Sequence, residues 1–275
     1  MSGSFLMKRH LSQVRSALGP VSVSIVVPCC NEEAGLRHLK SKLDAARLLL
    51  EPTYVLTFIL VDDGSTDGSW NVMCELFKEQ SGCILLRHST NRGIGAAILT
   101  GIRGAHTEIV CSIDADCSYD PCELEKLLPL LTCDVDLVTG SPYHPQGRVI
   151  GLPVWRLFLS RAASHLYRLV LGQRLHTYTS CLRVHRRRSI LQLNLRAQDF
   201  LAMAEWIGRV VLQGGVVVEC PVTLTQRVHG NSKMKTVPVL FRHFLLLSEL
   251  LVIRIWQGLV GRPRALFRSL DLNES

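Results

Sequence analysis

The stretch Glu108-Ile-Val-Cys-Ser-Ile-Asp-Ala-Asp-Cys-Ser-Tyr-Asp-Pro121 decides the fold. Its apolar run from Ile109 to Ile113 predicts a short buried β-strand. Asp114 and Asp116 follow at once, and because side chains alternate faces along a strand, both carboxylates are expected on the same side. Such oxygen-rich pairs suit Mg²⁺ or Mn²⁺, which also take oxygens from a substrate phosphate. An isolated Asp-x-Asp is more often a solvated acidic turn, so the surrounding chain must decide.

Apolar, β-branched runs alternate with amphipathic stretches along the first half of the chain. Strands are predicted for residues 21–28, 54–61, 83–86, 109–113 and 135–140. Helices are predicted between them, among them a helix over Pro121 to Leu131 and one that ends near Leu50 and carries an apolar stripe of Leu36, Leu39, Leu43 and Ala46. This rhythm predicts an α/β fold with a mostly parallel sheet flanked by helices. Ligands of such sheets bind at the carboxyl ends of the strands. Polar clusters follow four of these strands, at Asn31-Glu32, Asp62-Asp63, Asn91 to Gly95 and Asp114 to Asp116.

Composition narrows the class of protein. The 275 residues suffice for a full core, and no run reaches the roughly 18 apolar residues that a transmembrane helix needs. No apolar segment follows the N-terminal basic residues, so no signal peptide is expected. Ten cysteines without metal-ligand spacing indicate reduced thiols in a cytosolic protein.

Charge is divided unevenly along the chain. Residues 1–140 hold 12 Lys+Arg against 17 Asp+Glu, whereas residues 141–275 hold 19 against 6. The acidic half is where a metal could bind, and the basic half should meet a phosphate, a membrane surface or a nucleic acid. Nucleic acid is not expected, because no recognised binding motif accompanies the charge.

Five motifs appear in the order and spacing of a known family. They are Pro28-Cys-Cys-Asn-Glu32, Asp62-Asp63-Gly-Ser-Thr-Asp67, Asp114-Ala-Asp116, Thr179-Ser-Cys-Leu-Arg183 and Arg227-Val-His-Gly-Asn-Ser-Lys233. Over about residues 21–235 the chain resembles the family 2 glycosyltransferases of GT-A fold, and among them the dolichol- or polyprenyl-phosphate mannosyl- and glucosyltransferases. The resemblance implies inverting transfer of a hexose from a GDP- or UDP-sugar to a polyprenyl phosphate.

The resemblance also assigns roles to residues. It implies Mg²⁺ or Mn²⁺ on Asp114 and Asp116, which are catalytic together with Arg227 and Lys233. It implies nucleotide-sugar contacts at Pro28, Asn31, Glu32, Asp62, Asp63, Ser65, Asn91, Gly93, Asp114 and Ala115. A lipid phosphate is already an anion, so its site needs cations and neutral donors more than a base. The candidates are Arg148, Arg156, Ser160, Arg227, Ser232 and Lys233.

One departure from the family motivates the choice of Arg148. Where the family commonly has Gly-Ser-Arg after the fifth strand, this chain has Gly140-Ser141-Pro142. Arg148 lies six residues past Pro142, in a glycine-containing loop that leads to the helix bearing Arg156. We therefore expect Arg148 to replace the missing arginine at the acceptor phosphate.

The chain is expected to divide into a basic leader (1–20), the glycosyltransferase domain (21–235) and a C-terminal amphipathic, membrane-associating helix and tail (236–275). The helix predicted for Val239 to Trp256 has an apolar face of Phe241, Phe244, Leu247, Leu251, Val252, Ile255 and Trp256. Such a helix lies on a membrane surface, here the cytoplasmic face, and an integral-membrane partner protein is a further expectation. The alternative is a terminal helix packed into the core.

Other functions and roles stay open at this point. The same donor site could serve a saccharide or protein acceptor, or the chain could bind nucleotide sugars without catalysis. A nicotinamide enzyme is disfavoured, because the first strand leads to no Gly-x-Gly-x-x-Gly turn. Gly93 and Gly95 could simply let a helix start close against the sheet, and Glu205 could be a structural ion-pair partner.

Overall fold

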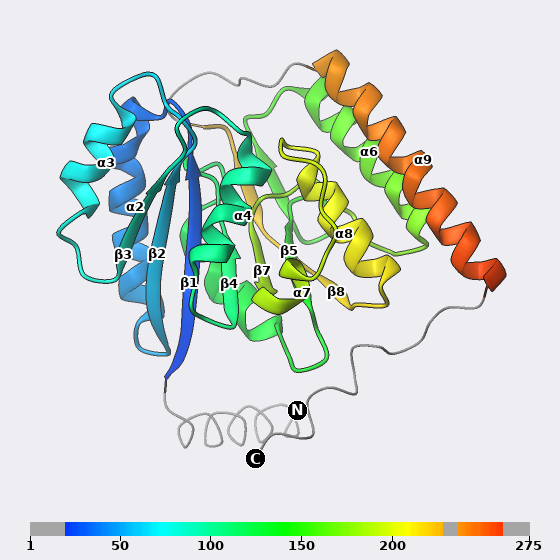
Figure 1. Cartoon of the computed structure of the whole chain (residues 1–275), viewed down its shortest axis with the longest axis horizontal. Helices are drawn as coiled ribbons and strands as arrows, with labels where there is room; N and C mark the ends of the chain where they lie inside the picture. The colour runs from blue at the N-terminus through cyan, green and yellow to red at the C-terminus, as the bar shows by residue number, and fades with distance from the viewer. Residues whose placement is uncertain (1–19, 228–235, 261–275) are drawn as a thin grey trace.

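The computed structural model describes residues 20–227 and 236–260, built around a seven-stranded sheet of order β3-β2-β1-β4-β7-β5-β8 (Figure 1). Strand β7 runs antiparallel to β4 and β5, and the other neighbours are parallel. Strands β6 and β9 form a separate parallel pair. The strands are β1 (Val21–Cys29), β2 (Tyr54–Asp62), β3 (Cys83–Arg87), β4 (Ile109–Ser112), β5 (Leu137–Ser141), β6 (Arg148–Ile150), β7 (Arg183–Arg186), β8 (Val217–Pro221) and β9 (Thr223–Thr225). The mostly parallel α/β sheet is therefore confirmed.

Helices cover both faces of the sheet and give the molecule two hydrophobic clusters. The cluster on one face includes side chains of α2, α3 and α5, and the cluster on the other includes side chains of α4, α6, α8 and α9. The helices are α2 (Leu36–Leu50), α3 (Ser69–Phe77), α4 (Ile94–Gly104), α5 (Leu124–Leu127), α6 (Val154–Leu171), α7 (Arg187–Leu191), α8 (Ala202–Leu212) and α9 (Thr236–Val260). The seven-stranded sheet thus has a hydrophobic cluster on each face, as an apolar, mostly parallel sheet requires.

Most predicted helices are found, with shifts that have local causes. The stripe Leu36, Leu39, Leu43 and Ala46 of α2 is buried as expected. The helix predicted for Pro121 to Leu131 is instead a 3₁₀ turn, the short α5 and a second 3₁₀ turn. Pro129 lies in that second turn, where its lack of an N–H donor interrupts an α-helix.

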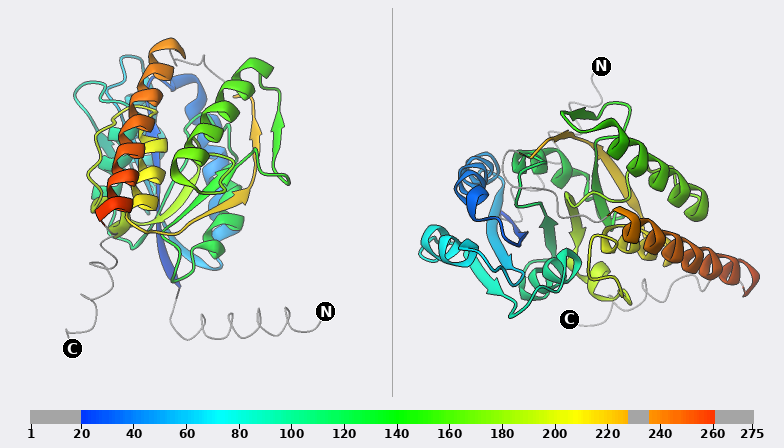
Figure 2. Two further views of the ribbon diagram at one scale, coloured as in Figure 1. Left: turned by 90° about the vertical axis from the view of Figure 1, so that its right-hand side faces the viewer. Right: turned by 90° about the horizontal axis from the view of Figure 1, so that it is seen from above.

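Helix α9 packs beside α6 and α8 at one end of the molecule (Figure 2). Its polar side faces inward. His243 Nδ1 lies 2.8 Å from Tyr167 Oη, Glu249 receives a hydrogen bond of 3.0 Å from Arg209, and Arg242 forms an ion pair with Asp199. Leu246, Leu247 and Leu250 are buried alongside. Six of the seven residues of the predicted apolar face remain exposed, and only Leu247 is buried.

Candidate active site

The loops that leave β1, β2, β3 and β4 meet at the carboxyl edge of the sheet, the upper edge in Figure 1. Strand β4 ends at Ser112, two residues before Asp114, so strand alternation does not place the two acids as expected. They lie in a turn in which Cys117 has a positive φ of 54° and the Ser118 N–H donates to Asp116 Oδ1 at 2.9 Å. The turn, rather than the strand, brings the two acids together.

The acid pair is electrostatically costly. Burial, followed by the negative charge of Asp116, raises the pKa of Asp114 to about 7, and the charge of Glu32 adds to this. The Cys181 thiol and Arg227 act in the opposite direction. Clustered acids of this kind are relieved by a cation. Two carboxylates that meet phosphate and water oxygens fit Mg²⁺ or Mn²⁺. Within the described residues, no cluster of three or more His, Cys, Asp or Glu side chains could hold a metal by itself.

Arg227 supplies a cation to this pair. Its Nη2 lies 2.7 Å from Asp116 Oδ2, and both side chains are largely buried. Strand β9 sets this position, because the Thr225 N–H and hydroxyl both donate to the Ser118 carbonyl, at 2.9 and 3.2 Å. The structure thus joins two predicted site residues that are 111 positions apart in the printed sequence.

The loops after β1 and β2 are tied together by predicted nucleotide-binding residues. The Asn31 N–H donates to Ser65 Oγ at 2.9 Å, and Asn31, with a φ of 52°, accepts from the Thr66 N–H at 2.7 Å. Asp62 is fully buried, accepts from the Ser65 N–H and pairs with Arg87 Nε at 2.9 Å. These contacts shape the loops, and direct nucleotide contacts of the same residues stay a prediction.

Asp63 anchors the loop that opens α4. One carboxylate oxygen receives the Arg92 N–H at 2.9 Å and lies 2.7 Å from His88 Nδ1, while the other receives the Gly93 N–H at 2.7 Å. Gly93 has a φ of 98°, and a Cβ there would lie 2.5 Å from the Gln198 carbonyl oxygen. This geometry supports a structural role for Asp63 and Gly93, in addition to any contact with a nucleotide.

Replacing Asp63 by alanine is expected to destabilise the fold by about 2–4 kcal/mol, because buried donors lose a charged acceptor. Urea denaturation measures this change in the free energy of unfolding. Asp134→Ala serves as the control, because Asp134 is exposed and its carboxylate accepts a local hydrogen bond from the neighbouring Thr132 hydroxyl. Equal stability of the two variants would show that Asp63 does not hold the loop.

The other predicted site residues differ in their burial and in their contacts. Pro28 and Ala115 are buried, Glu32 is half-buried, and Asn91 Nδ2 donates to Cys30 Sγ at 3.0 Å. Ser160 Oγ lies 3.4 Å from Thr179 Oγ1, so α6 meets the loop before β7. Arg148 is exposed and pairs with Thr223, four positions before Arg227 along the chain. Ser232, Lys233 and the side chain of Arg156 lie outside the described part of the structure.

Arg183, the last residue of the motif Thr179-Ser-Cys-Leu-Arg183, has a structural role for which the sequence motif gave no assignment. It is fully buried, and its Nη2 donates to the carbonyls of Tyr178 at 3.0 Å and Met203 at 2.6 Å. Burial lowers the pKa of Arg183 to about 10, while the nearby Asp114 acts against that shift. This buried arginine is a second source of positive charge near the acid pair. An arginine inside a strand segment is the feature of the sequence that could have indicated it.

Glu205 behaves as a structural residue. Its carboxylate accepts from the Arg209 side chain at 2.7 Å and from the N–H groups of Arg196 and Ala197. The ion-pair interpretation of Glu205 is therefore confirmed.

Comparison with known proteins agrees with this geometry. The model of the family described as glycosyl transferase family 2 matches residues 24–193. The chain is 33% identical over 218 residues to a polyprenol monophosphomannose synthase of Mycolicibacterium smegmatis, covering 76% of this chain and 80% of that one. It is 30% identical to an undecaprenyl-phosphate mannosyltransferase of Micrococcus luteus, covering 77% and 87%.

Among solved structures, the glucosyl-3-phosphoglycerate synthase of Mycobacterium tuberculosis, crystallised with Mn²⁺, UDP and glucosyl-3-phosphoglycerate, superposes with a TM-score of 0.62. The sequences are 21% identical, and the match covers 88% of this chain and 81% of that one. The fold is the GT-A fold of glycosyltransferases. The chain belongs to glycosyl transferase family 2.

Proposed function

We propose that this glycosyltransferase transfers a hexose from a GDP- or UDP-sugar to a polyprenyl phosphate, in one inverting displacement that depends on Mg²⁺ or Mn²⁺. The observation that carries the proposal is the contact between Arg227 and Asp116, which places a cation from the β9 side against the acid pair of the donor edge. The names of the M. smegmatis and M. luteus relatives support the lipid-phosphate acceptor.

The acidic and the basic side chains of the site have different proposed roles. Asp114 and Asp116 would hold the divalent ion, which when bound stabilises the leaving diphosphate as a Lewis acid. Arg227, which contacts Asp116, would orient an anionic phosphate beside them. Because a lipid phosphate is already deprotonated, positioning and charge neutralisation are what the protein must provide.

A panel of GDP- and UDP-sugars tests this proposal. The purified protein is incubated with each donor, with and without polyprenyl phosphate, and free GDP or UDP is measured. We expect one donor to release its nucleotide only when polyprenyl phosphate and Mg²⁺ or Mn²⁺ are both present. If every donor that releases its nucleotide does so equally well without polyprenyl phosphate, the result would count against the proposed acceptor.

Arg148 is proposed to contact the acceptor phosphate in place of the arginine lost at Pro142. Its strand partner Thr223 lies four residues before Arg227 along the chain, which supports a position near the same phosphate. We expect Arg148→Ala to raise the apparent KM for lipid phosphate several-fold, since an exposed ion pair contributes at most about 1 kcal/mol. Steady-state kinetics with varied lipid phosphate measures this, and parent-like kinetics would end the idea of a replacement.

The outer surface of α6 and α9 is proposed to rest on the cytoplasmic face of a membrane. The two helices lie side by side (Figure 2, left). Both have exposed apolar side chains. They include Trp155, Phe158, Leu166 and Leu169 of α6, and Phe241, Phe244, Leu245, Leu251, Val252, Ile255, Trp256 and Leu259 of α9. Apolar patches of this extent mark interaction sites. Among the described helices, none combines the length and apolarity that crossing a membrane requires.

Vesicle binding is expected to depend on this outer surface. The double variant Phe244→Glu, Val252→Glu should weaken partitioning onto phosphatidylglycerol-containing vesicles by about 10²-fold or more, since each buried side chain contributes about 1.5–3 kcal/mol. Cosedimentation measures it. Leu48→Glu on α2 is the matched control. Leu48 is 77% exposed, and α2 covers the opposite face of the sheet from α9 (Figure 1). Equal vesicle binding of both variants would contradict the proposed membrane surface.

A further inference from the structure

Hydroxyl side chains connect the acid pair with helix α6. Strands β4 and β5 both run antiparallel to β7, which lies between them, so β4 and β5 end at the edge of the sheet where β7 begins. Asp114 is two residues past the end of β4, Tyr143 is two residues past the end of β5, and Thr179 is in the segment that leads into β7. The Thr179 hydroxyl oxygen lies 3.4 Å from that of Ser160 on α6. Neighbouring strands are about 4.8 Å apart, so the strands that carry Asp114 and Tyr143 are separated by roughly 10 Å.

Tyr143 lies between the acid pair and α6. The Arg161 Cζ of α6 is 5.3 Å from the centroid of its ring. Burial raises the pKa of Tyr143, whereas a hydrogen bond with Ser160 and the charge of Arg161 act against that rise. The phenol therefore keeps its proton at neutral pH and can donate a hydrogen bond. Burial also raises the pKa of Tyr119, and the charges of Asp114 and Tyr143 raise it further, which indicates that both lie near Tyr119.

Arg161 brings a positive charge to the same place. It is exposed, and no carboxylate among the described residues pairs with it. A guanidinium held over an aromatic ring is attracted by the face of the ring, and it can still donate from its outward N–H groups. The contact with Tyr143 also limits the conformations of the long side chain, so less entropy is lost when it binds a ligand. Arg161 and Tyr143 together offer an oriented cation beside a neutral donor.

The surroundings of this pair suit a ligand that is anionic at one end and apolar at the other. Phosphate oxygens are bound well by an arginine together with hydroxyl donors. On α6, Phe158 is 71% exposed and Ala162 is exposed, so apolar side chains flank Arg161 along the helix. An anionic group at Arg161 would therefore have the acid pair on one side and an apolar surface on the other.

We propose that the Tyr143 hydroxyl and the Arg161 guanidinium together bind the phosphate of the acceptor, with its apolar chain along the exposed apolar side chains of α6. Two hydrogen bonds of about 2.8 Å to different oxygens of one phosphate can bridge the separation between these two side chains. This assignment rests on the proposed function and adds two binding residues to it, both outside the motifs by which the sequence resembles its family.

Calorimetric titration with farnesyl phosphate tests the assignment without requiring catalysis. EDTA is present so that no divalent ion recruits the phosphate to the acid pair. Tyr143→Phe removes only the hydroxyl and is expected to raise the Kd about tenfold, because a hydrogen bond to a charged group is lost. Arg161→Gln is expected to raise it about fivefold, the upper end for an ion pair that includes an exposed charge. Inorganic phosphate, which lacks the apolar chain, should bind the parent more weakly than farnesyl phosphate does.

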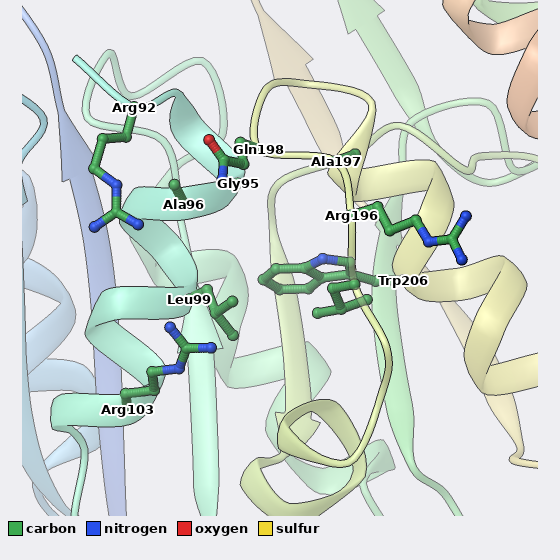
Figure 3. Close-up of a pocket in the computed structure, with 10 residues that line it drawn as sticks. Arg92, Gly95, Ala96, Leu99, Arg103, Arg196, Ala197, Gln198 and Trp206 are labelled. Atoms are coloured by element: carbon green, nitrogen blue, oxygen red, sulfur yellow. The ribbon is translucent and has the colours of Figure 1, made fainter.

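Two arginines serve as matched controls. Arg103 is exposed near the C-terminal end of α4, and it lines a cavity of about 250 Å³ between α4 and the segment that leads into α8 (Figure 3). Neither Tyr143 nor Arg161 lines that cavity, so Arg103→Gln should bind farnesyl phosphate like the parent. Arg168→Gln removes an equal charge about two turns farther along α6 and should also bind like the parent.

The possible results separate this assignment from the proposed function. If the parent binds farnesyl phosphate and either Tyr143→Phe or Arg161→Gln binds it equally well, the joint contact is wrong and the proposed function still stands. Equal weakening by Arg161→Gln and Arg168→Gln would show general attraction of anions to α6, which also overturns the assignment, as would inorganic phosphate that binds as tightly as farnesyl phosphate. A parent that binds no farnesyl phosphate contradicts both proposals. The expected affinities without any transfer of sugar would support the contact and contradict the proposed function alone.

Discussion

Replacing Asp116 by alanine is expected to lower turnover by about 10²-fold or more, the loss typical of one key electrostatic stabiliser. Asp116 is the residue through which the acid pair meets Arg227, at 2.7 Å, and the residue proposed to hold the divalent ion with Asp114. The fold should survive, because the substitution removes a negative charge that raises the pKa of Asp114. Steady-state kinetics with saturating donor and acceptor measures the loss.

Asp120 offers a matched control for that experiment. It lies four residues further along the same segment and is paired with Lys42 at 2.6 Å, with 41% of its side chain exposed. Asp120→Ala should therefore keep turnover near that of the parent. Undiminished activity of Asp116→Ala, or of the parent in EDTA, would remove the metal-dependent mechanism.

Arg227→Ala is expected to lower kcat/KM for the lipid phosphate by about 10²-fold, near the lower end of the about 2–5 kcal/mol that truncating one partner of a buried charge pair costs, because the Arg227 side chain is 27% exposed. The loss should appear as a higher KM for lipid phosphate or a lower kcat, with the affinity for the nucleotide sugar nearly unchanged. Arg227→Lys keeps the charge but not the planar fork, so it should restore only part of the activity.

The KM for lipid phosphate and the affinity for the nucleotide sugar together show whether Arg227 belongs to the acceptor site or to the donor site. Arg37→Ala is the control for loss of an arginine, since Arg37 is exposed and pairs with Glu75 of α3, which is not a predicted site residue. If Arg227→Ala weakens binding of the nucleotide sugar and leaves the KM for lipid phosphate unchanged, Arg227 belongs to the donor site. If it behaves like the parent in both measurements, the polyprenyl-phosphate acceptor is wrong.

The succession of strands and helices along the chain was predictable, because apolar residues recur with one period in strands and with another in helices. The first four strands and the Leu36–Leu43 stripe of α2 needed only local patterns. The reversal of β7 between β4 and β5 could not be predicted in this way, because strand direction depends on the path of the chain through Thr179–Leu182. That path brings Arg183 behind Asp114.

The candidate site shows a similar division. Asp114, Asp116 and Arg227 were predicted, and the structure brings them together. The anchoring role of Asp63 could not be separated from nucleotide binding, because a polar Asp-Asp-Gly turn has the same pattern in both cases. The helix α9 was correctly expected to be amphipathic, but an amphipathic pattern does not say which face packs inward. Here ion pairs of Arg242 and Glu249 with the domain decide it.

Transfer of labelled sugar into a lipid product tests the central claim most directly. The protein is incubated with a radiolabelled GDP- or UDP-hexose, polyprenyl phosphate and Mn²⁺, and the organic phase is counted beside reactions with Asp116→Ala and with a water-soluble phosphorylated acceptor. We predict label in the organic phase for the parent and Asp120→Ala, and a loss of about 10²-fold for Asp116→Ala. Label that enters only the water-soluble acceptor, or lipid product formed equally by Asp116→Ala, would contradict the account.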